Sequence, residues 1–61
     1  MTLDDLHKPA YIGDSVYCGW LATYFNMLVI GTCNDGRVLQ NVIYLEPEVV
    51  DNLINFAKKG A

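Results

Sequence analysis

Side chains able to perform nucleophilic or acid–base chemistry are few in this 61-residue sequence. His7 is the only histidine, and it lies in a polar N-terminal segment without a metal-binding motif, so we expect a surface side chain. Gly13-Asp14-Ser15 has the composition of a nucleophilic serine motif, but the sequence places no histidine to act as its base within hydrogen-bond reach. This segment is better explained as a turn that leads into a strand.

The remaining candidates for chemistry have simpler structural explanations. Cys18 and Cys33 are expected on opposite faces of a sheet, which excludes a disulfide or a shared metal site, because both need convergent side chains. Glu46 and Glu48 flank Pro47, where negative charge stabilises the start of a helix. We therefore predict a protein that is not an enzyme, with no catalytic residue, no cofactor and no metal site.

Charge and hydropathy restrict the kind of partner. The net charge is −3 and the four basic residues are scattered, so direct nucleic-acid binding is disfavoured, because it needs a clustered basic patch. The longest apolar runs are far below the roughly 18 to 20 residues that span a bilayer, and the first residues lack the features of a signal peptide. We expect a cytoplasmic protein that contacts neither nucleic acid nor membrane.

Local patterns predict an α+β fold, a three-stranded antiparallel meander with one C-terminal helix packed on one face. Residues 16–20, 27–33 and 38–45 are rich in β-branched and aromatic side chains, which favour strands. Asp35-Gly36 lies between the last two segments and is typical of a type I′ hairpin turn.

A change to helical periodicity follows at Pro47, and Gly60 is the expected stop. The apolar residues of this segment form one broad stripe, so the helix is expected to lie on the sheet. The stripe consists of Val49, Val50, Leu53, Ile54, Phe56 and Ala57. Residues 1–10 are expected to form a flexible arm, and residues 11–61 the single domain.

Alternation along the strands divides the side chains of the sheet into two faces. A two-residue hairpin loop would pair Ile30 with Asn41 and Leu28 with Ile43. The face that carries these aliphatic side chains is expected under the helix. The opposite face is also mostly apolar, whereas the uncovered face of an antiparallel sheet is normally polar.

The second face is the predicted protein-binding surface, because exposed apolar patches mark partner sites, and tyrosine and methionine are typical of interface cores. Its members are Tyr17, Met27, Val29, Val42 and Tyr44. A hydrophobic fraction of 52% is high for so small a core, so we expect this face to pack on a second copy or on another protein. The alternative is that the N-terminal arm covers it with Leu3, Leu6 and Tyr11.

Two further contacts are predicted at the tip of the first expected hairpin. Tyr24 and Phe25 are rigid aromatic residues of the kind that dominate binding hot spots. The alternative is a tip that folds back onto Trp20.

Two stretches carry a resemblance to a known group: YIGDSVY at positions 11–17 and IYLEPEV at positions 43–49. With them the chain resembles small, largely uncharacterised proteins of tailed bacteriophages and prophages over about residues 11–56. The resemblance implies strands, an Asx-Gly turn and a helix in the order given above, and no catalytic residues. The chain departs from the pattern at Gly19, Leu21 and Ala22, where such proteins tend to carry acidic or polar residues.

We therefore predict a small interaction module that acts without catalysis. A phage origin implies that it binds and modulates or inhibits a defence or metabolic protein in the cytoplasm of the host bacterium, alone or as a homodimer. One alternative is a self-associating structural or assembly accessory protein. Another is a protein that binds a small ligand, such as a nucleotide, between protomers.

Overall fold

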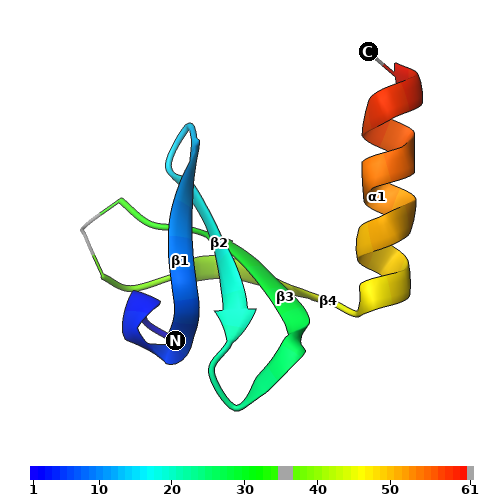
Figure 1. Cartoon of the computed structure of the whole chain (residues 1–61). Coiled ribbons are helices and arrows are strands. Elements are labelled where there is room, and N and C mark those ends of the chain that lie inside the picture. Colours follow the sequence, from blue (N-terminus) through cyan, green and yellow to red (C-terminus); the bar gives the residue numbers. More distant parts are fainter. Residues whose placement is uncertain (35–36, 61) are drawn as a thin grey trace.

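The computed structural model describes residues 1–34 and 37–60, with only the backbone for Tyr24 and Phe25. A short 3-10 helix comes first and is followed by four strands and one α-helix (Figure 1). These are η1 (Leu3–Asp5), β1 (Leu6–Gly13), β2 (Val16–Leu21), β3 (Tyr24–Thr32), β4 (Gln40–Leu45) and α1 (Pro47–Gly60). Each strand is antiparallel to the next, in the order β1-β2-β3-β4. The predicted antiparallel sheet and C-terminal helix are confirmed.

The prediction of three strands is wrong, because β1 forms a fourth strand that begins inside the expected arm. His7 pairs with Trp20 and Ala10 with Cys18, so two residues between the pairs lie opposite Gly19. Such a bulge accommodates a proline, which cannot donate a ladder hydrogen bond. The bulge interrupts the alternation of side chains, which is the pattern by which a strand is normally detected in sequence.

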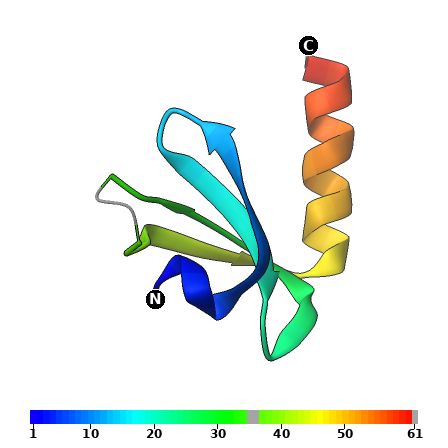
Figure 2. The ribbon, with the colours of Figure 1, turned by 60° about the vertical axis from the view of Figure 1, so that its left-hand side comes forward.

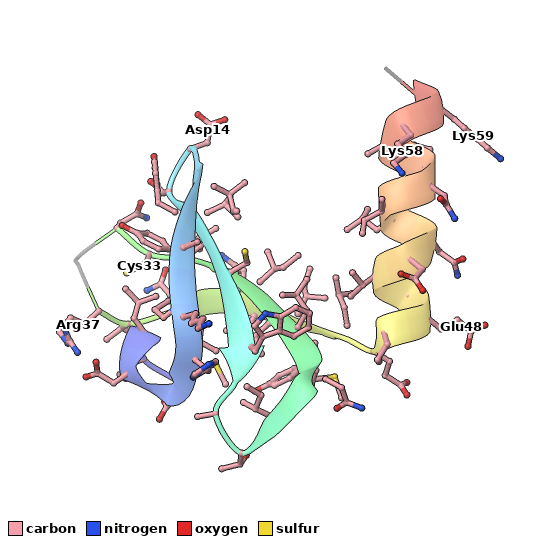
Figure 3. The ribbon with its side chains drawn as sticks, in the orientation of Figure 1. Asp14, Cys33, Arg37, Glu48, Lys58 and Lys59 are labelled. Carbon is pink, nitrogen blue, oxygen red and sulfur yellow. The ribbon has the colours of Figure 1, made fainter. Side chains whose placement is uncertain are left out.

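A tight turn joins β1 to β2 at the position predicted for one. Gly13 pairs with Val16, so Asp14 and Ser15 form a two-residue loop. Both loop residues have positive φ, 53° and 67°, as a type I′ turn requires. Asp14 lies at the tip of this hairpin (Figure 3).

The register between β3 and β4 differs from the predicted one by two residues. Ile30 pairs with Ile43 and not with Asn41, and Leu28 pairs with Leu45. Between the Ile30–Ile43 pair and the Thr32–Gln40 pair the register shifts by one residue. Two residues of β4, Asn41 and Val42, lie opposite Gly31 there and form a bulge, in which Asn41 has a φ of 55°. The predicted Asp35-Gly36 turn lies outside the described residues.

The N-terminal segment closes the sheet on itself. Thr2 forms an antiparallel bridge with Val38, the Leu3 amide donates to the Arg37 carbonyl at 2.8 Å, and the Leu39 amide donates to the Met1 carbonyl at 2.9 Å. The first residues therefore join the edge beside β4, while β1 forms the opposite edge. Figure 2 shows the result, a sheet strongly curled around an interior.

An exposed ion pair accompanies this closure. The Arg37 guanidinium donates to the Asp4 carboxylate, and both side chains are largely exposed. The hydrogen bond that Arg37 donates to this carboxylate, together with the negative charge of the carboxylate, raises the pKa of Arg37. Because solvent screens an exposed pair, the backbone bonds of Met1 and Leu3 are the stronger attachment of this segment.

The core lies on the concave side of the curled sheet. Leu6, Val29, Cys33 and Leu39 are buried there, and Val29 has no exposed surface at all. The half-buried residues that pack against them are Leu3, Tyr17, Leu21 and Val42. Every element from η1 to β4 therefore contributes to the interior or its rim, and α1 does not.

Helix α1 starts at Pro47 and ends at Gly60, as predicted, but it does not cover the sheet. It stands beside the sheet, attached at its N-terminal end to β4 (Figures 1 and 2). Val50 is half-buried, whereas every other residue of the helix is exposed. The expectation of a helix packed along one face of the sheet is met only near its first turn.

Gly19 is predicted to be the position of the sheet least tolerant of a side chain. A Cβ atom there would lie 3.0 Å from Leu6 Cβ and 3.1 Å from Pro9 Cα. Gly19→Ala should therefore lower the free energy of unfolding by about 1–3 kcal/mol, measured by urea unfolding followed through Trp20 fluorescence. Gly60→Ala is the control, because its Cβ meets no atom within 4 Å, and its effect should stay within about 0.5 kcal/mol. Equal effects would contradict the close crossing of β1 over Gly19.

Candidate protein-interaction surface

Three of the predicted binding residues lie in or against the core. Val29 is fully buried, and Tyr17 and Val42 are half-buried against the same cluster. The face expected to be open is therefore covered at these positions. The cover is the N-terminal segment with Leu3 and Leu6, which was the alternative interpretation of the sequence.

Tyr11, the third residue expected in that cover, lies at the edge of the core. Its ring packs on that of Tyr17 with a centroid distance of 5.1 Å and a tilt of 59°. Its hydroxyl accepts a hydrogen bond from the Ser15 amide at 3.3 Å. Through these two contacts Tyr11 holds the first hairpin next to the core, although Tyr11 itself is 60% exposed.

The other predicted contacts are distributed differently. Tyr44 pairs with Val29 across the sheet and is exposed, because it lies near the end of β4, away from the N-terminal cover. Met27 is half-buried. The side chains of Tyr24 and Phe25 lie outside the described part of the structure, so their role as contacts stays a prediction.

The candidates for chemistry do not come together. His7 pairs with Trp20, at the end of β1 opposite to the turn that holds Ser15. Cys33 is buried in the core and Cys18 is half-buried, and both are free thiols. Within residues 1–34 and 37–60, no cluster of three or more His, Cys, Asp or Glu side chains could hold a metal ion.

The described residues instead display apolar side chains on two adjoining surfaces. On the sheet, the register places Trp20 beside Leu28 and Ile30 beside Ile43, on the face opposite to the core. We call these four residues the outer sheet face. Leu28 and Ile30 are half-buried, while Trp20 and Ile43 are exposed.

The second surface is the apolar stripe of α1. Four of its residues count among the exposed large hydrophobic side chains: Val49, Leu53, Ile54 and Phe56. Phe56 is the most exposed of them, at 72%. The charged side chains Glu48 and Lys59 lie on the other side of the helix and point away from the sheet (Figure 3).

The sequence predicted both the stripe and the apolar character of the outer sheet face. It also predicted that the stripe packs on this face and that each therefore buries the other. In the structure they meet only near the first turn of α1, because the chain passes directly from β4 into the helix through Glu46 and the helix then rises beside the sheet (Figure 1). The signal available in the sequence was the excess of apolar residues. It indicated that a surface remains uncovered, but not which one.

Comparisons with known proteins add no identity: no protein-family model, curated protein or solved structure matches the chain. The resemblance to phage proteins therefore stays a prediction. Among the described residues, no helix has the length and apolar character needed to cross a membrane.

A lysine should lower the free energy of unfolding far more on the concave face of the sheet than on the outer sheet face. Val29→Lys should lower the free energy of unfolding by at least about 3 kcal/mol, because an unpaired ammonium would be buried in the core. Ile43→Lys, on the exposed outer sheet face, should change it by less than about 1 kcal/mol. Circular dichroism during urea unfolding of the two variants measures the difference. Retained stability in Val29→Lys would show that the concave side is not the core.

Proposed function

We propose that this protein is a non-enzymatic interaction module that binds a protein partner through the stripe of α1 and the adjoining outer sheet face. The observation that carries the proposal is the exposure of the stripe, above all of Phe56. A helix of 14 residues with this periodicity gains most of its stability from packing of its apolar face. An unpacked stripe therefore favours a partner that covers it.

The composition of the surface supports a protein as the partner. Aromatic and aliphatic side chains lie together, while the charged residues of the helix are spaced on its other sides, as at the core of protein interfaces. Helices of this type commonly bind by placing residues spaced three and four apart into an apolar groove. Val49, Leu53 and Phe56 have this spacing.

The partner is inferred from the resemblance and from the charges of the helix. If the chain is a phage protein, as the resemblance suggests, its partner is a bacterial protein whose activity it modulates or inhibits. Self-association is the other candidate, and the charge arrangement of α1 described below favours it. Binding of a nucleotide-type ligand between protomers has no observation in its favour.

Site-specific photo-crosslinking in bacterial cells tests the proposed surface. A benzophenone side chain at position 56 should form a discrete cross-linked product with one protein, because Phe56 would lie in the interface. The same side chain at Asn55, on the polar side of the helix, is the matched control and should give little product. Leu53→Lys should remove the product at position 56.

Equal cross-linking at positions 55 and 56, or none at either, would contradict the proposed surface. Mass spectrometry of the product identifies the partner as a bacterial protein or as a second copy of this chain.

A further inference from the structure

We propose that the partner of α1 is a second copy of this chain, and that the two helices pair antiparallel about a two-fold axis near Leu53. This inference rests on the proposed function and specifies its partner. Three observations carry it: the division of the apolar stripe, the positions of two opposite charges, and the surface area of the single chain.

The stripe is wide enough to serve two contacts. Val50 is the one half-buried residue of the helix, which contacts β3 and β4, and Ile54, which follows it by one turn on the same side, is exposed. Val49, Leu53 and Phe56 form a separate ridge at i, i+4 and i+7, and all three are exposed. A second helix can therefore pack on this ridge without displacing the contact between α1 and its own sheet.

Two charges border the ridge on the side away from the sheet. Glu48 and Lys59 are separated by 11 positions, close to three turns at about 3.6 residues per turn, so they lie on the same side of the helix. Figure 3 shows that both point away from the sheet, one near each end of α1. The helix thus carries a negative charge at one end of this border and a positive charge at the other.

This arrangement is complementary to itself in one orientation only. In an antiparallel pair with Leu53 near the axis, Glu48 of each copy lies level with Lys59 of the other to within about one residue, roughly 1.5 Å along the axis. The same pairing brings Leu53 opposite Leu53 and Val49 opposite Phe56, again to within about one residue. A parallel pair would instead place like charges together, which is unfavourable. A two-fold pairing also uses the same surface on both copies, so no further copy can add to it and the assembly stops at a dimer.

The surface area of the chain is consistent with a missing partner. The accessible surface is 4404 Å². A compact monomer of 6.8 kDa is expected to expose roughly 3,950 Å², so this chain exposes about 450 Å² in excess. A standard interface takes about 800 Å² from each partner. The excess supplies about half of that area, and the ordinary surface around the ridge supplies the rest.

Sedimentation equilibrium of the purified full chain, over about a hundredfold range of concentration, tests the pairing. The wild-type chain is expected to be a dimer, and Phe56→Glu a monomer that keeps its helical circular dichroism. Glu48→Lys and Lys59→Glu should each weaken dimerisation by roughly tenfold, because each replaces two attractive pairs by repulsive ones. An equimolar mixture of these two variants should associate with near wild-type affinity, because the charges are then complementary again.

Lys58→Glu is the matched control. It makes the same charge change one residue earlier and on another side of the helix, so its dissociation constant should stay within about twofold of the wild-type value. A wild-type chain that is monomeric at every concentration would overturn the proposal. A dimer that survives Phe56→Glu, or two charge variants that do not rescue each other, would also overturn it.

These outcomes are separable from failure of the proposed function. A monomeric chain whose position 56 cross-links to a bacterial protein would leave the interaction surface in place and remove only the second copy.

Discussion

The attachment of the N-terminal segment to residues 37–39 is the contact on which the rest of the structure depends. Two backbone hydrogen bonds, from Leu3 to Arg37 and from Leu39 to Met1, hold this segment across the open side of the curled sheet. With it come Leu3 and Leu6, which pack on Val29 and its neighbours. A chain of this size buries only about 60% of the surface that it exposes when unfolded, so a cover contributed by its first six residues is a large share of the core.

Because the N-terminal segment covers the core, the apolar stripe of α1 is not needed to bury it. In a sheet with an open concave side, the stripe of α1 would be needed to bury the core, and the helix would be part of the fold. Here the core is complete without it, so the stripe is left largely exposed beside the partly exposed outer sheet face. The apolar residues of the sequence, which are many for a single small core, are thus divided between an interior on one side of the sheet and a partly exposed apolar surface on the other.

Local signals predicted the local structure well. Proline at position 47 and glycine at position 60 set the bounds of α1, and turn residues at 13–15 set the first observed hairpin. The fourth strand was missed because Lys8-Pro9 forms a bulge opposite Gly19 and breaks the alternation. The register of β4 was missed for two reasons. One residue of the difference is already present where Thr32 pairs with Gln40, on the side of the turn, and the bulge at Asn41, which has a positive φ, adds the second. The assignment of the faces failed for a different reason: the cover is held by backbone groups of Met1 and Leu3, which residues of almost any type could provide.

Hydrogen exchange of the amides of Leu3 and Leu39, measured at low protein concentration, is the most direct test of this account. Both amides donate across the closure, so they should exchange only through global unfolding, with the same free energy as amides in the middle of β2 and β3. Amides of α1 should then exchange faster, through local opening of a helix without a packed face. If Leu3 and Leu39 exchange as rapidly as an unstructured peptide while β2 and β3 stay protected, the N-terminal segment does not close the core, and the assignment of the two faces is wrong.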